Sequence, residues 1–515
     1  MATVTRAPED ETDNQATLVY VDPGTLVVGA NARLTARLNK GYVRSIRERG
    51  VLEPVVAYRD DNGALVVLRG QRRTLAAVQA ERPTIPVMVV PRPAEPDRLI
   101  DQVSENDHRE SLTVAERVTA YEQLAAFGVS AAQIAKRMAT TRPAVDNALA
   151  VARSKLARSA TERWEFLTVD QAAIVAEFDD DAEAVKQLVV AAQRGGFDHQ
   201  AQRLRDARAE AAAKAVAADA LAAAGVTVVE RPGWDNKTIK RLADLTHDDE
   251  PLTEDNHAAC PGHAAYLDNK WIYPDEHHDQ DGNVDDGDGD DADRDDDLDV
   301  DNADVGDRPR PYRAWVPAYV CTDFAARGHT PRWRAHDSGS GRKTTAEMTD
   351  DERAAARAER RDVIQSNKDW DSAETVRRQW LRTFLTRKTA PATAAGFIAG
   401  SLARTDHAVT QALTYGNRLA HDLFGLPDQA PTLGRRAPAM VELVGKATDA
   451  RAQVIALGLV LAAYEEATSR NSWRTVSDST TRYLRFLEAH GYELSTVERR
   501  ACGEAPQPDP EADGA

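Results

Sequence analysis

Residues 50–81 read GVLEPVVAYRDDNGALVVLRGQRRTLAAVQAE and determine which fold the N-terminal part of the chain can adopt. Val55–Tyr58 and Leu65–Leu68 are short β-rich runs on either side of Asp60-Asp61-Asn62-Gly63, so the pattern predicts a β-hairpin. The residues after the second run are typical of a helix, which we place over Arg73–Glu81. A hairpin followed at once by a helix is therefore the centre of the N-terminal unit.

The flanking sequence extends this pattern on both sides. Lys40–Arg49 is predicted as a helix before the hairpin, and Pro86–Val90 as a strand after the second helix. Short strands that alternate with helices predict a compact α+β unit. From Leu112 onward the hydrophobic spacing becomes helical, so we expect mostly α-helical domains after this unit. Residues 225–335, which separate two predicted helical regions, are expected to be irregular.

Length and composition exclude several classes of protein. The chain has 515 residues, enough for several domains, and its 42% hydrophobic and 29% charged residues are typical of soluble globular proteins. Three cysteines exclude a disulfide scaffold and suit a reducing cytosol. The longest apolar run, Val454–Tyr464, is too short to span a bilayer, and the polar N-terminus has no secretory signal. We expect a cytoplasmic protein without membrane contact.

The distribution of charge matters more than its total. A formal net charge of −18 argues at first against a nucleic-acid partner. Residues 275–307, however, hold 17 Asp or Glu against one Arg, so nearly all of the negative charge lies in this run. The rest of the chain is close to neutral and can hold basic patches. The run itself is typical of a disordered, solvated loop.

Residues 130–153 have the pattern of a helix-turn-helix. A first helix is predicted over Ser130–Met138, where Ser130 and Gln133 have capping-box spacing, and a second, recognition helix over Arg142–Arg153. Residues near the start of a recognition helix reach base edges, while nearby Lys and Arg hold phosphates. An ordinary helical hairpin is the alternative. The candidate DNA contacts, which share the polar side, are Gln133, Lys136, Arg137, Thr140, Thr141, Arg142 and Asn147.

Three short strings carry chemistry suited to a nucleotide. They are Gly50-Val51-Leu52-Glu53-Pro54, Gly70-Gln71-Arg72-Arg73, and Glu105-Asn106 followed by Arg109. A glycine at a strand-to-helix turn lets backbone N–H groups approach a phosphate, and arginines add further donors. Carboxylate and amide oxygens suit Mg²⁺, which shares phosphate ligands. A turn with solvated arginines is the alternative for the second string.

The order GVLEPVVAYR, GQRRTLAA and SENDHRESL, followed by a helix-turn-helix, resembles the ParB-type chromosome and plasmid partition family. Members typically carry a Gly-x-x-Gln-Pro, a Gly-Glu-Arg-Arg and a Glu-Asn-x-x-Arg string in this order. The resemblance covers residues 18–160. It implies that the N-terminal unit binds CTP with Mg²⁺ and that the helix-turn-helix binds a centromere-like site in double-stranded DNA. It also implies a homodimeric clamp that works with a ParA-type ATPase.

The resemblance also implies nucleotide-site residues in this sequence: Arg33, Gly50, Gly70, Arg72, Arg73, Glu105, Asn106 and Arg109. Two departures are visible, because Glu53 stands where the family usually has Gln, and Gln71 where it usually has Glu. An amide can orient water but cannot accept a proton at neutral pH. We therefore treat Gln71 as the catalytic position and expect CTP hydrolysis to be weak or absent.

A second set of residues has spacing that suits zinc. Cys260-Pro261-Gly262-His263 resembles one half of a tetrahedral Zn²⁺ site, and Cys321 with His329 offers a longer second half. The 57 residues between His263 and Cys321 include the acidic run, so a metal would close the base of that loop. Two unpaired cysteines with chance histidines are the alternative.

The C-terminal segment is predicted to be helical. Thr349 with Glu352 and Asp371 with Glu374 have the spacing of helix starts, and Val454–Tyr464 is apolar on all sides, as in a buried helix. Family members dimerise through a C-terminal domain that is usually shorter. A surface that faces DNA or a partner is the alternative, because basic residues gather on one expected helix: Arg377, Arg378, Arg382, Arg387 and Lys388.

We therefore expect a DNA-associated, ParB-like partition protein that forms a CTP-dependent clamp. A ParB-related transcriptional repressor and a nuclease built on the same N-terminal fold are the alternatives. The predicted domains are a disordered tail (1–17), a ParB-like nucleotide-binding domain (18–108), a helix-turn-helix domain (109–197), an Ala-rich helix with connector (198–258), a Cys/His segment with the acidic loop 275–307 (259–335), a C-terminal helical domain (336–502) and a second disordered tail (503–515).

Overall fold

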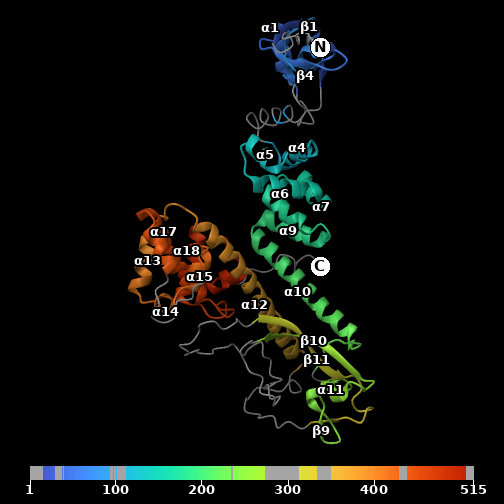
Figure 1. The fold of residues 1–515 in the computed structure, drawn as a ribbon, viewed down its shortest axis with the longest axis vertical. Coiled ribbons are helices and arrows are strands. Elements are labelled where there is room, and N and C mark those ends of the chain that lie inside the picture. Colours follow the sequence, from blue (N-terminus) through green and yellow to red (C-terminus); the bar gives the residue numbers. More distant parts are fainter. Residues whose placement is uncertain are drawn as a thin grey trace, which may run out of the picture. The chain divides into compact units, whose positions relative to one another are not determined.

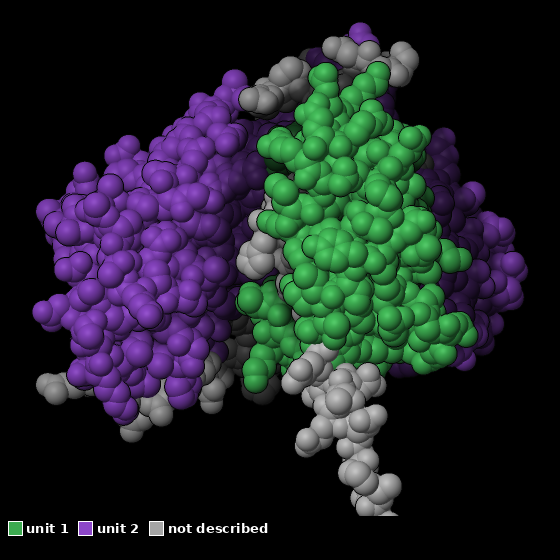
Figure 2. Space-filling view, turned by 90° about the horizontal axis from the view of Figure 1, so that it is seen from above, with its two compact units in different colours: residues 1–197 green, residues 198–515 purple. Residues whose placement is uncertain are grey.

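The computed structural model describes residues 16–28, 38, 40–92, 97, 100, 112–233, 236–272, 312–332, 349–427 and 438–505. The chain divides into two compact units, residues 1–197 and 198–515, and each is described by itself (Figure 1; Figure 2). Among the described residues, no helix is both long enough and apolar enough to cross a bilayer. The acidic run and most of both predicted tails lie outside the described residues.

Unit 1 begins with a mixed five-stranded sheet in the order β1-β5-β3-β4-β2. The strands are β1 (Thr17–Val21), β2 (Val27–Val28), β3 (Val55–Arg59), β4 (Leu65–Arg69) and β5 (Ile85–Val89). Strand β3 is antiparallel to β4 and parallel to β5. Helices α1 (Lys40–Arg49) and α2 (Gln71–Gln79) contribute their apolar faces to the same core, in which Val55, Ala76 and Ile85 are fully buried.

The predicted hairpin is confirmed and its turn has a clear physical cause. The carboxylate of Asp60 accepts hydrogen bonds from the backbone N–H of Asn62 (3.0 Å) and of Ala64 (2.8 Å). Gly63 has φ +79°, a left-handed conformation that favours glycine. Helix α2 begins at Gln71, two residues before the predicted start, because Gly70 is itself the N-cap.

The rest of unit 1 is helical, as predicted. Its helices are α4 (Val114–Ala126), α5 (Ala131–Arg137), α6 (Arg142–Arg153), α7 (Lys155–Arg163), α8 (Val169–Ala176) and α9 (Ala182–Arg194). The predicted capping box at Ser130 is present, since its side chain accepts from the N–H of Gln133 and the Gln133 side chain accepts from the N–H of Ser130. Helix α6 packs against α4, α5 and α8, so it lies at the centre of this group.

The long helix α10 (Phe197–Ala223), all of which except Phe197 belongs to unit 2, leads into two small sheets. The main feature is a hairpin of β10 (His263–Ile272) and β11 (Tyr312–Cys321), paired antiparallel from His263↔Cys321 to Ile272↔Tyr312 (Figure 1). The expectation that residues 225–335 are irregular is therefore wrong for these strands. The remaining elements are β6 (Thr227–Val228), β7 (Lys240–Arg241), β8 (Leu245–His247), β9 (Glu250–Pro251), α11 (Glu254–His257) and β12 (Thr330–Pro331).

A helical domain forms the C-terminal part of unit 2. Its helices are α12 (Asp350–Phe384), α13 (Ala394–Ala403), α14 (His407–Tyr415), α15 (Arg418–Leu423), α16 (Pro438–Gly445), α17 (Asp449–Glu466), α18 (Asp478–Ala489) and α19 (Thr496–Ala501). The predicted buried helix is confirmed as α17, whose apolar residues are covered on all sides. The capping box at Thr349 starts α12, whereas the second predicted start, at Asp371, is wrong because α12 continues through it.

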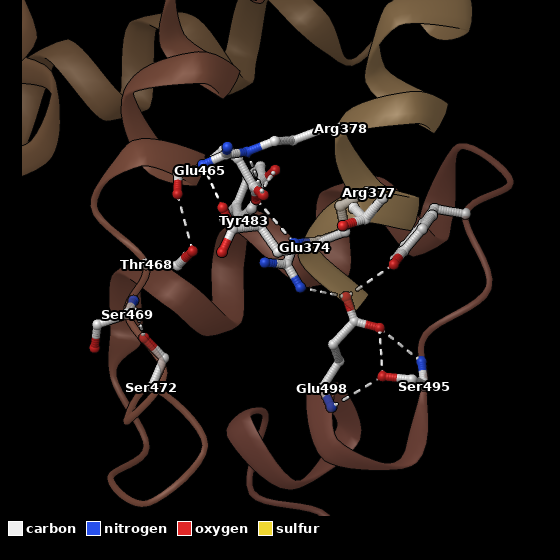
Figure 3. A network of polar contacts seen from close by, with 12 residues as sticks. Glu374, Arg377, Arg378, Glu465, Thr468, Ser469, Ser472, Tyr483, Ser495 and Glu498 are labelled. Atoms are coloured by element: carbon white, nitrogen blue, oxygen red, sulfur yellow. Dashed lines mark hydrogen bonds and ion pairs between the residues drawn. The ribbon is translucent and has the colours of Figure 1, made fainter. Parts of the chain in front are cut away.

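A buried ionic network holds three helices of this domain together (Figure 3). The fully buried guanidinium of Arg377, on α12, donates to Glu465 on α17 and to Glu498 on α19, each at 2.8 Å. Burial alone would lower the pKa of Arg377, but the two carboxylates raise it well above its usual value. Removal of one partner would leave an uncompensated charge in the core.

The basic residues predicted for this domain do not form a single exposed surface, so that expectation is wrong. Arg377 lies in the core, and Arg378 pairs with Glu374 on the same helix. Arg382 pairs with Asp422 at 2.6 Å. Arg387 and Lys388 follow the end of α12, and the guanidinium of Arg387 lies over the ring of Phe384. Arg377, Arg378 and Arg382 are paired with carboxylates, so the five residues do not form one free basic face.

Candidate nucleotide, nucleic-acid and metal sites

The first two nucleotide strings meet at one end of the β3–β4 hairpin. Because these strands are antiparallel, the start of β3 and the end of β4 are neighbours, which brings Glu53-Pro54 next to Gly70-Gln71. The guanidinium of Arg73 joins them, since its Nη1 donates to the carbonyl oxygens of Glu53 (2.8 Å) and Pro54 (3.0 Å). It also lies 3.3 Å from a carboxylate oxygen of Glu53.

The start of α2 has the features of an anion site. Gly70 has φ +96°, and a Cβ there would lie 3.2 Å from the Cγ2 of Val55, so the turn favours glycine. The N-cap of α2 is a glycine, which makes no side-chain cap hydrogen bond, and the first turn of α2 has no acidic residue. The exposed guanidinium of Arg72 lies 5.4 Å from the ring centre of Tyr42. Backbone N–H groups at a helix start beside an exposed arginine suit a phosphate.

The other predicted nucleotide residues have different surroundings. Gly50 is buried with φ +75° at the end of α1, where its N–H donates to the carbonyl of Ile46 at 2.9 Å, so it shapes the backbone. Gln71 is the half-buried first residue of α2. The third string, with Glu105, Asn106 and Arg109, and also Arg33, lies outside the described residues.

The two predicted helices of the helix-turn-helix are α5 and α6, joined by a short turn in which Ala139 has φ +50°. Thr141 is the N-cap of α6 and accepts a hydrogen bond from the N–H of Ala144. Buried Ile134 and Val145 pack the pair onto its neighbours. This arrangement leaves the start of α6, with Thr141 and Arg142, exposed.

The candidate DNA contacts fall into two groups: exposed basic side chains, and side chains that already have structural contacts. Lys136 and Arg142 are exposed, and Arg142 makes a 3.5 Å ion pair with Asp146 on the same helix. Arg137 pairs with Asp97 at 2.7 Å with its side chain 44% exposed. Such exposed pairs are weak and can be exchanged for phosphate.

The remaining candidates have structural contacts. The Gln133 side chain completes the capping box of α5. Asn147 is half-buried and donates to the carboxylate of Asp170 on α8 at 2.9 Å. Thr140 is half-buried in the turn, where its N–H donates to the carbonyl of Ala135. Lys136, Arg137 and Arg142 are therefore the strongest candidates for contact with DNA.

Three of the four predicted zinc ligands lie together, and His257 takes the place of the fourth, His263. The ligand atoms of His257, Cys260, Cys321 and His329 all lie within 4.8 Å of one another, and we call these four residues the Cys2His2 cluster. His263 is not among them. Its Nδ1 instead lies 3.0 Å from Nδ1 of His257, and its ring stacks on Tyr319. The signal for His257 was available, because His257-x-x-Cys260 has the same spacing as Cys260-x-x-His263.

The cluster lies in a low-dielectric environment. Burial, followed by the nearby His329 and His263, lowers the pKa of His257 to about 4, so this imidazole is neutral at pH 7. Burial likewise lowers the pKa of His329 and raises the pKa of the Cys321 thiol. The cluster lies where the β10–β11 ladder ends at His263 and Cys321, whereas the acidic run leaves at Ile272. The expectation that a metal would close the base of that loop is therefore wrong.

The N-terminal part of the chain is similar to a known family of protein domains. Residues 36–106 match the model of the ParB N-terminal domain. A "Probable chromosome-partitioning protein ParB" from Treponema pallidum is 30% identical over 137 residues, which cover 26% of this chain and 42% of that relative. The chain thus spans less than half the length of the curated relative that it matches.

Solved structures of ParB proteins also align with this chain. ParB from Caulobacter crescentus, truncated at the C-terminus and complexed to the centromeric parS site, is 21% identical, with 34% of this chain and 92% of that chain covered and a TM-score of 0.26. The same protein complexed with CTP-gamma-S is 24% identical, with 35% and 98% covered and a TM-score of 0.17. By the match of residues 36–106, the chain carries a ParB N-terminal domain and resembles the partition proteins of that family.

Proposed function

We propose that this chain is a ParB-like DNA-binding protein of plasmid or chromosome partition. The observation that carries the proposal is the match of residues 36–106 to the ParB N-terminal domain, with the Gly70 turn and Arg72 at an uncapped helix start inside it. A nucleotide is the ligand class that this turn suits best, because it offers backbone N–H groups and a guanidinium to phosphate oxygens. The resemblance to the family supports CTP as that nucleotide.

The residues of the turn have separate tasks in this proposal. The N–H groups at the start of α2 and the guanidinium of Arg72 hold phosphate oxygens. Arg73 is a positioning residue, because its hydrogen bonds to the carbonyls of Glu53 and Pro54 fix the turn relative to β3. Gln71 orients water without accepting a proton, so turnover is slow. Glu105 and Asn106 are the proposed Mg²⁺ ligands.

DNA binding is proposed for α5 and α6. The exposed start of α6 enters the major groove with Arg142, while Lys136 and Arg137 contact phosphates. Nucleotide binding favours closure of a homodimer around DNA, in which the C-terminal helical domain holds the two chains together. A ParA-type ATPase is the proposed partner. In this arrangement the protein loads at a centromere-like site and moves along the duplex.

Sequencing of genomic DNA recovered with the full-length protein tests the proposal. We expect a broad region of enrichment around one short site, because a clamp that slides spreads away from where it loads. Narrow peaks at promoters would instead identify a repressor and contradict the partition role. The matched control is Arg142→Ala, which should remove the enrichment while α6 stays folded, since this side chain is exposed.

A further inference from the structure

The Cys2His2 cluster joins segments that are distant in sequence. His257 ends α11 and Cys260 follows in the next turn, whereas Cys321 ends β11 and His329 lies after it. Three of the four residues are buried and Cys260 is half-buried. Two thiols and two imidazoles are the ligand set of closed, structural Zn²⁺ sites. The cluster has four protein donors, so it leaves no open position for substrate.

The spacing of the donor atoms fits a metal. With Zn–S near 2.3 Å and Zn–N near 2.0–2.1 Å, the edge between sulfur and nitrogen in a tetrahedron is about 3.6 Å. The distance from Sγ of Cys260 to Nε2 of His329 is 3.6 Å. The remaining donor atoms fall within the same 4.8 Å limit. The four side chains thus converge on a volume of the size that one ion fills.

Unpaired nitrogen atoms in the cluster point to a missing ligand. The His257 side chain is 1% exposed, and its Nε2 has no hydrogen-bond partner among the described residues. A buried polar atom of this kind is costly unless something binds it. The other nitrogen, Nδ1, lies 3.0 Å from His263, as a metal-bound histidine usually has its second nitrogen held.

The backbone around the cysteines supports the same interpretation. The N–H of Gly262 donates to Sγ of Cys260 at 3.5 Å, which stabilises negative charge on that sulfur. A Cβ on Gly262 would lie 2.8 Å from Sγ of Cys321, so glycine allows the two sulfurs to approach. His263 and Gly262 are therefore supporting residues that orient the donors.

The fold around the cluster has a small core and short strands, so a bound metal would stabilise it. Among the described residues, few buried hydrophobic side chains pack with Cys321 of the cluster: Leu242, Leu245, Leu252 and Phe324. Strands β8, β9 and β12 are two or three residues long, and short strands with so small a core are marginal by themselves. An ion held by α11, the following turn and the end of β11 would join these pieces at one point.

We propose that His257, Cys260, Cys321 and His329 bind one structural Zn²⁺ ion. The ion stabilises the end of the β10–β11 hairpin and the small sheet beside it, and it takes no part in nucleotide or DNA chemistry. The proposal is independent of the partition role, because it rests on residues outside the ParB N-terminal domain.

The first test is elemental analysis of the full-length protein purified without chelator or affinity metal. We expect about one zinc per chain, and Co²⁺ exchanged into the site should give the absorption bands of tetrahedral thiolate coordination. The two cysteines should resist thiol reagents until a strong chelator is added. Zinc-free protein that takes up neither Zn²⁺ nor Co²⁺, or a Cys260–Cys321 disulfide in its mass spectrum, would overturn the proposal.

Variants separate ligands from supporting residues. Cys260→Ser and His257→Ala should lose the metal, whereas His263→Ala should retain it with affinity lower by about 10–100-fold. Cys502→Ser is the matched control, because this half-buried cysteine lies at the end of α19 and should leave the zinc content unchanged. If His263→Ala lost the metal and His257→Ala kept it, the assignment of ligands would be wrong.

Discussion

Arg72 and Arg73 are neighbours in sequence but have different surroundings. The guanidinium of Arg73 is bound to the carbonyls of Glu53 and Pro54 and its side chain is 19% exposed, whereas Arg72 is exposed beside the start of α2. The motif alone could not separate these roles, because both residues match the family string equally. The structure favours Arg72 as the phosphate contact and Arg73 as the residue that fixes the turn.

Arg72→Ala should weaken CTP binding by about tenfold or more without a change in the midpoint of thermal unfolding, because it removes a charge-assisted contact from an exposed side chain. Arg73→Ala should lower the free energy of unfolding by about 1–3 kcal/mol and weaken binding as a consequence. Calorimetry with CTP and thermal unfolding measure both quantities. Normal affinity in the Arg72 variant would exclude it from the site.

Gln71→Glu should raise the rate of CTP hydrolysis while affinity changes little. The substitution restores a carboxylate that can accept a proton or hold water, and it leaves Gly70, Arg72 and Arg73 in place. Phosphate release is the measurement, with Gln71→Ala as the control that should stay slow. Equal rates in the Glu and Ala variants would show that this position does not limit turnover.

At the scale of elements, α5 and α6 illustrate what local sequence signals can predict. The Ser130 and Thr141 caps define where these helices start, so their boundaries follow from the sequence. Asn147 looked equivalent to Arg142 on the polar side. Its hydrogen bond to Asp170 depends on how α8 packs, which local spacing does not encode.

Arg142→Ala should cost about 1–3 kcal/mol in binding to the preferred DNA site and relax sequence preference. Lys136→Ala should weaken binding to all sequences and reduce the salt slope by about 1. Gel-shift titrations over a range of salt concentrations measure both effects. The interpretation of α6 as the recognition helix would fail if Arg142→Ala retained full site preference.

The pairing of β10 with β11 and the position of His257 in the cluster could not be predicted from the sequence. Residues 273–311 separate the two strands, so no turn signal connects them. The choice between His257 and His263 as ligand depended on side-chain direction, because both lie three residues from Cys260. The register places His263 opposite Cys321, yet its imidazole packs on Tyr319 and His257. Such long-range pairing follows only from the folded chain.

At the scale of the whole molecule, an extensive hydrophobic core lies in the C-terminal helical domain, around α12, α17 and α18. The apolar character of α17 was sufficient to predict its burial. The buried Arg377 network was not predictable, because its two carboxylate partners come from α17 and α19, far along the chain. This core provides a test of packing that is separate from the nucleotide and DNA sites.

Gly458→Ala should destabilise this domain by about 1–3 kcal/mol, although alanine normally favours a helix. A Cβ at Gly458, on α17, would lie 2.5 Å from Cζ of Phe424 and 3.2 Å from Cδ1 of Leu385. Gly396→Ala on α13 is the control and should stabilise by up to about 1 kcal/mol, because no described atom lies within 4 Å of its added Cβ. Denaturant unfolding measures the free energy of unfolding of both variants, and equal changes in the two would contradict the packing around Gly458.

The most direct test of the account is calorimetric titration of the full-length protein with CTP and Mg²⁺, repeated with the DNA recovered by pull-down and with ATP as the control nucleotide. We expect saturable heat with CTP, tighter binding when DNA is present, and binding weaker by about tenfold or more in Arg72→Ala. An absence of heat with CTP in both conditions, or equal heats with CTP and ATP, would contradict the assignment of a CTP-controlled, ParB-like protein.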